Sequence, residues 1–326
     1  MSVQKGSALL VVLMILALMA ALATDMTISF QTQLQRSRRI NDSLQAKYAL
    51  LYAEAQAAAS LQSAAEVSPS TSQETLTESE EVDENTKVSW KTEDRQNCFN
   101  LNSLKDMPIG ILEDVPYKIG VFEALLEKRG VEKYRVEEIG QSIADYIDND
   151  TSPRIKGAED DYYQHRPKKY LTAGQNIFLP AEIRDVKGMT EDIYQKLSPF
   201  ICATFSNELA ININTLTEQQ ASLLAALFLN NISELDAAAL IRKRPDNGWK
   251  TVDAFLYQAQ RDFTATKPLV DSLKKQLTTR SSYFLITSTV HQGELTLGMR
   301  TFLLYDEKNK TTKIYLRQLT DGSSED

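Results

Sequence analysis

The sequence of 326 residues is poor in the residues and motifs from which catalytic and metal sites are commonly built. Two cysteines and two histidines are too few for a zinc ribbon or an iron–sulfur cluster. No Gly-x-Ser-x-Gly elbow, P-loop or Gly-x-Gly-x-x-Gly motif occurs. Positive charge is not in excess either: 36 Lys and Arg stand against 44 Asp and Glu, and a net charge of −8 argues against a protein that coats nucleic acid. These absences favour a structural or binding role over an enzymatic one, and they predict no nucleic-acid partner.

Hydrophobic residues are instead concentrated near the amino terminus. Residues 8–23 are all apolar, and with Ser7 and Thr24 the stretch would form about 27 Å of helix, near the lower limit for crossing a bilayer. Three interpretations are open. The stretch is a secretory signal peptide cut after Ala23, an uncut anchor, or a helix that is kept after cleavage between Gly6 and Ser7.

The residues that follow favour the third interpretation. Neither Pro nor Gly occurs between Ser7 and Val67, so nothing interrupts a helix there. Apolar or small residues recur in steps near three and four, at Phe30, Leu34, Ser37, Leu44, Tyr48, Leu51, Ala55, Ala58 and Ala65. The pattern predicts one helix of about 60 residues that continues from the apolar stretch, a continuity that a discarded signal peptide does not explain.

A short basic leader that ends in Gly6, an apolar helix and an amphipathic extension together resemble a type IV prepilin or a type II secretion pseudopilin. The resemblance implies that a prepilin peptidase cuts after Gly6 and methylates Ser7, although Phe or Met is usual at that first mature position. Most such subunits carry Glu where this chain has Val11. Because a carboxylate at bilayer depth is costly without a cation beside it, Val11 suits a subunit at the tip of a filament. The alternative is that Val11 only extends a membrane anchor.

Strand signals flank the rest of the chain. Residues 67–85 are rich in Ser, Thr and Glu and are expected to be a solvated connector. Alternation and β-branched residues predict short strands at 87–91 and 97–102, then a three-stranded antiparallel meander at 283–290, 294–305 and 312–319. The long helix can cover the apolar face of this sheet. The predicted fold class is therefore α+β, with a pilin-like head.

Between the two groups of strands the signals are helical. Helix periodicity or caps occur at 120–129, 132–147, 191–197, 217–229, 234–244 and 252–259. We therefore predict a helical domain inserted into the sheet. The expected organisation is a leader (1–6), a transmembrane and amphipathic helix (7–66), a linker with the first strands (67–102), the inserted domain (103–280), the last strands (281–319) and a tail (320–326).

The inserted domain contains a weak internal repeat. Residues 100–104, Asn-Leu-Asn-Ser-Leu, recur as Asn-Ile-Asn-Thr-Leu at 212–216, which indicates either two divergent copies of a small module or chance similarity. The second copy resembles helix-hairpin-helix (SAM-like) modules, some of which bind DNA. Its hairpin, residues 230–233, has no Gly to bring backbone N–H groups close to phosphate, so we interpret it as a structural or partner-binding unit.

The strongest chemical signal is an acidic loop at 148–161. Five carboxylates occur within its fourteen residues: Asp148, Asp150, Glu159, Asp160 and Asp161. Like charges this close require either full solvation or a cation, and oxygen donors without nearby His or Cys favour Ca²⁺ over zinc. Part of the loop has the spacing of an EF-hand, but Pro153 occupies the position of its required Gly. A solvated acidic loop is the alternative.

Four motifs in one order extend the resemblance to nearly the whole chain: residues 98–102, the Asp-x-Asp with 157–162, 186–189 and 211–215. Together they are similar to the large minor pseudopilin of type II secretion, the general secretion pathway protein K family. This resemblance implies calcium in the inserted domain, a complex with the I and J minor pseudopilins, and a place at the pseudopilus tip. It also implies one inner-membrane helix, a periplasmic head and contact with the assembly platform. We carry calcium over to the five carboxylates only, and leave Asn176 out.

The only two cysteines are Cys98 and Cys202. A periplasmic head would meet an oxidising compartment, so we expect a disulfide between them in preference to two buried thiols. The rival from another class is a secreted calcium-binding or nucleic-acid-binding protein whose apolar stretch is removed as a signal peptide.

Overall fold

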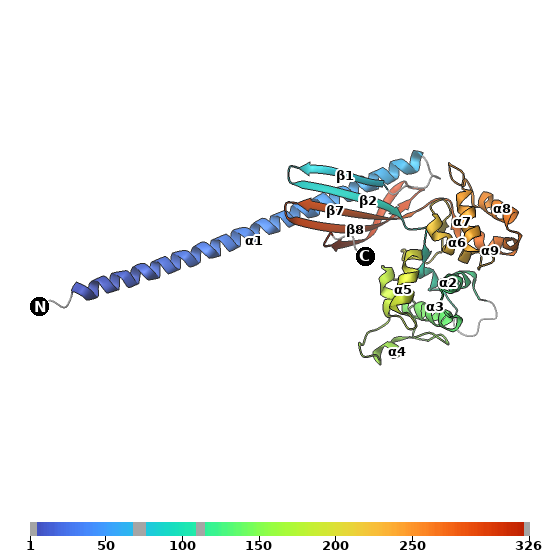
Figure 1. The fold of residues 1–326 in the computed structure, drawn as a ribbon, viewed down its shortest axis with the longest axis horizontal. Coiled ribbons are helices and arrows are strands. Elements are labelled where there is room, and N and C mark those ends of the chain that lie inside the picture. The colour runs from blue at the N-terminus through green and yellow to red at the C-terminus, as the bar shows by residue number, and fades with distance from the viewer. Residues whose placement is uncertain (1–4, 68–75, 109–114, 323–326) are drawn as a thin grey trace.

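The computed structural model describes residues 5–67, 76–108 and 115–322. A long helix, α1 (Lys5–Val67), projects from the remainder of the molecule by most of its length (Figure 1). Its 63 residues confirm the single helix that the sequence predicts, and at 1.5 Å per residue it is about 95 Å long. Within the described residues, one helix, Ala8–Ser63, is long and apolar enough to cross a membrane, and its apolar window is wholly exposed.

A five-stranded antiparallel sheet packs on the distal end of α1. Its strand order is β1-β2-β7-β8-β9, with β1 Leu76–Asp83, β2 Thr86–Asp94, β7 Tyr283–Gln292, β8 Leu295–Asp306 and β9 Thr311–Thr320. The neighbours β2 and β7 pair along the whole of β2, although the helical domain lies between them in the sequence. The helical domain is therefore an insertion between two adjacent strands, as predicted.

Two predictions for the segment before the helical domain were wrong, one of a connector and one of a strand. The connector is shorter than expected, because Leu76–Asp83 forms the edge strand β1; its Glu-rich sequence has low strand propensity, and pairing with β2 overrides that preference. Charged side chains on an edge strand also discourage pairing with other chains. The strand expected at 97–102 is reduced to β3 (Phe99–Asn100), which pairs in parallel with β4 (Ile201–Cys202) outside the main sheet.

The face of α1 that covers the sheet is not the predicted stripe. Small residues let the helix approach closely, and its buried positions are Ala46, Ala49, Leu50, Ala53, Ala57 and Leu61. They contact an apolar sheet face that includes Val88, Ile286 and Leu303. The predicted stripe lies about half a turn away, where Leu44 is 50% and Tyr48 is 70% exposed. The helix therefore has two apolar faces, one of them uncovered.

An ion pair between a buried glutamate and a half-exposed arginine joins the helix to the last two strands of the sheet. Glu54 on α1 accepts hydrogen bonds from Nε and Nη2 of Arg317 on β9 at 2.7 and 2.8 Å, and from the Thr301 hydroxyl on β8 at 2.8 Å. Such paired, charge-assisted contacts compensate for the burial of the carboxylate.

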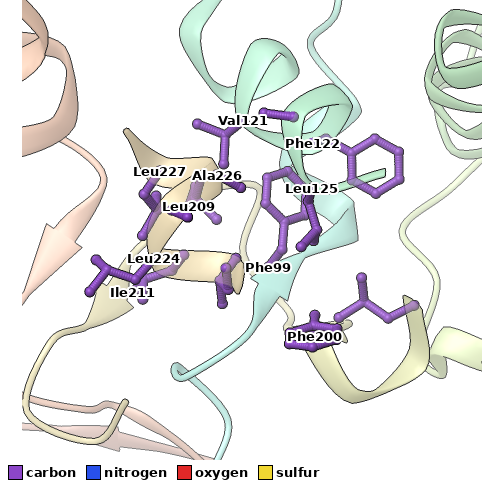
Figure 2. Packing of buried hydrophobic residues seen from close by; sticks show 14 of the residues in the cluster. Phe99, Val121, Phe122, Leu125, Phe200, Leu209, Ile211, Leu224, Ala226 and Leu227 are labelled. Atoms are coloured by element: carbon purple, nitrogen blue, oxygen red, sulfur yellow. The ribbon is translucent and has the colours of Figure 1, made fainter. Parts of the chain in front are cut away.

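The inserted domain lies beyond the sheet, at the opposite end of the molecule from the amino terminus (Figure 1). Its core joins both halves of the domain: Phe99, Phe122 and Leu125 come from the first half, and Leu224 and Leu227 from the second (Figure 2). Its α-helices are α2 Tyr117–Lys128, α3 Lys133–Ile147, α4 Asp160–Gln164, α5 Glu191–Leu197, α6 Ala221–Leu227, α7 Glu234–Arg242, α8 Val252–Asp262 and α9 Val270–Lys274. Short 3₁₀ helices are η1 Leu101–Leu104, η2 Pro180–Asp185, η3 Ser198–Phe200, η4 Glu218–Gln220 and η5 Thr264–Leu269, and a second parallel pair is β5 Ile211–Asn212 with β6 Leu277–Thr278.

The weak sequence repeat corresponds to two copies of one module. Asn102 donates from Nδ2 to the carbonyls of Ile177 and Thr204, and its Oδ1 accepts the Ile177 N–H. Asn214 repeats the scheme: Nδ2 donates to the carbonyls of Trp249 and Thr279, and Oδ1 accepts the Trp249 N–H. Each asparagine follows the first strand of a parallel pair and precedes two helices. The 148–176 segment of the first copy corresponds to the much shorter turn after α7 in the second.

Candidate functional site

A buried cluster of three carboxylates lies where α3 ends. Asp145 in the last turn of α3 and Asp148 just after it are three residues apart, so they lie on the same side of the helix. The acidic loop then folds back and brings Glu159, the residue before α4, beside them. Carboxylate oxygens of Asp145, Asp148 and Glu159 lie within 4.8 Å of one another, and the three residues are at most 5% exposed.

One cation is already part of this cluster. The guanidinium of Arg154, itself buried, donates from Nη1 to Asp145 and, at 2.6 Å, to Asp148. Its Nη2 donates to the Met107 carbonyl, and its backbone N–H donates to Oδ2 of Asp145 at 3.2 Å. Arg154 therefore neutralises one of the three negative charges and fixes the loop to the end of α3. Burial still raises the pKa of Asp145, although the hydrogen bond from Arg154 opposes that shift.

Glu159 has no such compensation. Among the described residues, neither of its buried carboxylate oxygens has a hydrogen-bond partner. Burial, followed by the charges of Asp145 and Asp148, raises the pKa of Glu159 to about 7. A buried carboxylate without a partner is costly unless it is protonated or meets a cation. Calcium binds carboxylate oxygens at about 2.3–2.6 Å, so one ion can contact oxygens that lie up to about 5 Å apart. The oxygens of this cluster lie within that separation. The residues thus fit a calcium ion.

The loop is held in place before any ligand binds. A Cβ atom on Gly157 would lie 1.8 Å from Oδ2 of Asp145, so only glycine permits this close approach. Nζ of Lys187 donates to the carbonyls of Lys156 and Gly157 at 3.1 Å, and the Lys156 N–H donates to Oε1 of Gln141 at 2.7 Å. Glu159 also lines a cleft of about 830 Å³ beside α4.

The predicted ligand residues divide into two groups. Asp148 and Glu159 belong to the cluster, whereas Asp150 and Asp161 are exposed. Asp160 accepts hydrogen bonds from the backbone N–H and hydroxyl of Thr172, both at 2.8 Å.

Asp145 was not among the predicted ligands, because it lies in the helix before the acidic loop and not in the loop itself. The available signal was its position three residues before Asp148 in a predicted helix. Asn176, which we left out, accepts a hydrogen bond from Nζ of Lys105 at 3.3 Å and donates to Asn207 at 2.7 Å.

The predicted disulfide is confirmed. Cys98 and Cys202 are bonded, with their Cα atoms 5.7 Å apart. The bridge lies beside the parallel pair β3–β4, where it joins the beginning of the first module to its end. Its place at the boundary between the sheet and the helical domain makes it a structural bond, remote in sequence from the acidic cluster.

A long apolar helix under an antiparallel sheet, interrupted by a helical domain, defines the class of protein: a pilin-like subunit with an insertion. The family described as "Type II secretion system (T2SS), protein K" matches this chain over residues 97–206 and 211–280, the two modules seen in the structure. The putative type II secretion system protein K of Escherichia coli K12 is 44% identical over 97% of this chain and 98% of its own length. The chain belongs to the type II secretion system protein K family, the large minor pseudopilins.

Other relatives agree with this assignment. The type II secretion system protein K of Klebsiella pneumoniae is 36% identical over 92% of each chain. A solved chain from the GspK-GspI-GspJ complex of the enterotoxigenic Escherichia coli type 2 secretion system is 28% identical, with a TM-score of 0.73 over 87% of this chain and 99% of that chain.

Proposed function

We propose that this minor pseudopilin leads the periplasmic pseudopilus, forms its tip with minor pseudopilins I and J, and helps initiate its assembly for protein export. The position of the helical domain carries the proposal. It occupies the end of the head farthest from the amino terminus (Figure 1). In a filament of parallel helices, the next subunit would otherwise pack at that end. The solved relative that this chain resembles comes from a complex of K with I and J.

Two features of α1 support the same role. The apolar stretch has Val11, exposed by 56%, so residues 8–23 bring no carboxylate into the bilayer that would require a cation from a subunit above it. The uncovered stripe with Leu44 and Tyr48 faces away from the sheet and is available to the helices of I and J. We infer that α1 spans the inner membrane after a prepilin peptidase cuts at Gly6, and that the assembly platform then extracts it with the growing filament.

Gold labelling of sheared pseudopili tests the position in the filament. A chain with an epitope tag after Asp326 is expected to give label at one end of each pseudopilus, because its helical domain blocks a further subunit. A tagged major pseudopilin is the control, and it should label the shaft. Label from this chain repeated along the shaft would contradict a place at the tip.

We also propose that the acidic cluster holds Ca²⁺ through Asp145, Asp148 and Glu159. The carboxylate of Glu159, which has no hydrogen-bond partner in the described part of the chain, supports the site. A bound ion would neutralise the remaining charge and join α3 to the acidic loop. Asp150 and Asp160 lie near enough for their charges to raise the pKa of Glu159, so they strengthen the negative potential around the ion. The role of the ion is structural.

Stabilisation by calcium should increase with pH. The pKa of Glu159 is raised from 4.5 to about 7 in the folded protein. Protonation of Glu159 therefore stabilises the metal-free fold; this contribution is complete below pH 4.5 and is lost as the pH rises through 7. Calcium requires the deprotonated form. At pH 8, calcium at about 100 times Kd should add about 2.7 kcal/mol, or roughly 5–10 °C in melting temperature, and the shift should be smaller at pH 6.

Thermal melting of the full chain in detergent, with chelator or excess Ca²⁺, measures this difference. Glu159→Gln should abolish the shift at both pH values, whereas Asp161→Asn, at an exposed carboxylate, should keep it. A wild-type melting temperature that does not respond to chelation would exclude the metal site. An equal response at pH 6 and pH 8 would exclude Glu159 as the titrating ligand.

A further inference from the structure

We propose that Arg154 is a specificity-determining residue of this cation site: it sets the charge that an ion must balance, and it keeps the site assembled while no ion is bound. The inference rests on the proposed calcium site. Its starting point is the charge count within the cluster, where three carboxylates and one guanidinium give −3 + 1 = −2. One divalent cation balances that charge in full, whereas a trivalent ion would leave a buried positive charge.

The count holds because the neighbouring cations already have acidic partners. Nζ of Lys156 pairs with Glu137, and Nζ of Lys187 lies 3.7 Å from Glu138. The neighbouring acids Asp150 and Asp160 add to the negative potential, but they are more exposed than the cluster, so solvent screens their charges more than those of the three buried carboxylates. Arg154 differs from all of these groups because its side chain is only 4% exposed and contacts two of the three carboxylates directly.

Arg154 does not take the place of the ion. Its guanidinium binds one oxygen each of Asp145 and Asp148, and its backbone N–H binds the second oxygen of Asp145. Both oxygens of Glu159 have no hydrogen-bond partner among the described residues. The second module also has an arginine after its second helix that bonds a backbone carbonyl. There Arg244, just after α7, donates from Nη1 to the Leu216 carbonyl at 2.7 Å, much as Arg154 donates to the Met107 carbonyl.

In both modules, then, an arginine after the second helix holds the segment that follows the Asn-x-Asn motif. The burial of Arg244 lowers its pKa. In the first module, two carboxylates are added around the arginine, and the longer loop supplies a third. An arginine after the second helix is thus common to both modules. The three acids around Arg154 are what distinguishes the first module as a cation site.

Competition between Ca²⁺ and La³⁺ on the full-length protein in detergent tests the inference. Arg154→Gln leaves the cluster at −3, so its preference for La³⁺ over Ca²⁺ should rise at least tenfold over wild type. Its melting temperature in chelator should fall, and Ca²⁺ should raise it by more than in wild type. Arg166→Gln is the matched control and should leave the preference unchanged, because Arg166 lies in the same 148–176 segment but contacts Tyr170 and the Asp185 carbonyl.

Arg154→Lys separates charge from packing. It keeps the charge of −2 but loses the forked contact with both carboxylates and the Met107 carbonyl. We therefore expect the ion preference of wild type together with a lower melting temperature. It also keeps the test decisive if Arg154→Gln does not fold in chelator.

The possible outcomes distinguish the two proposals. Wild-type protein that binds neither ion would overturn the calcium site itself. Wild-type protein that binds Ca²⁺, with an Arg154→Gln variant of unchanged ion preference, would overturn the role of Arg154 alone. Calcium binding that appears only in Arg154→Gln would show that the arginine replaces the ion, which contradicts both.

Discussion

Replacing Cys98 and Cys202 together by serine is expected to lower the free energy of unfolding of the helical domain by about 4–5 kcal/mol. The bridge spans 104 residues of sequence, and closing a loop of about 100 residues removes roughly this much chain entropy from the unfolded state. The two cysteines are also buried, and burying a serine hydroxyl costs free energy unless it forms a hydrogen bond. A loss of this size is comparable to the whole stability of many domains.

The two tryptophans of the chain allow the measurement to be made domain by domain. Trp90 lies on the sheet, and Trp249 lies in the core of the second module. In a Trp90→Phe background, fluorescence during urea unfolding reports Trp249 alone. Reduced protein with both cysteines should behave like the serine variant, which serves as the control. A free energy of unfolding of the serine variant within about 0.5 kcal/mol of that of the oxidised protein would contradict a stabilising bridge.

The second large effect is expected at the proposed processing site. Gly6→Val should leave the chain uncut and reduce export of secreted proteins at least tenfold in cells that lack the native subunit. An uncut chain keeps its basic leader, which contains Lys5, on the cytoplasmic side of the membrane. Extraction of the helix would then have to move that charge through the hydrocarbon core, which is costly.

Ser7→Phe is the matched control for that variant. It restores the residue that is usual at the first mature position of pseudopilins and should be processed and support export as wild type does. Immunoblots that separate the cut from the uncut chain, together with an export assay, give both readouts. Normal export by an uncut Gly6→Val chain would show that processing is not needed.

The parts of the fold that the sequence predicted are those with strong local signals. The absence of Gly and Pro between Ser7 and Val67 predicted α1. Helical signals at 191–197 and 234–244 predicted α5 and α7, which Thr190 and Ser233 cap in the structure. The edge strand β1 was missed because its Glu-rich sequence signals solvent exposure, and only its pairing with β2 makes it a strand. The face of α1 that meets the sheet was missed because alanines, not large residues, form that contact.

The acidic site was predicted in part for a similar reason. A run of carboxylates in one loop is visible in the sequence, and it indicated Asp148 and Glu159. Asp145 belongs to a helix, and Arg154 reads as an ordinary loop residue until the fold places its side chain between two acids. Which carboxylates of a loop turn inward depends on tertiary contacts such as the close approach of Gly157 to Asp145, and a sequence does not contain that distance.

The central claim is that the apolar helix is retained in the mature protein. The most direct test is the intact mass and amino-terminal sequence of the protein purified from the membranes of cells with an active secretion system. We predict a chain that begins at Ser7 and carries one added methyl group. A chain that begins at Thr24, with the apolar stretch removed, would contradict the account.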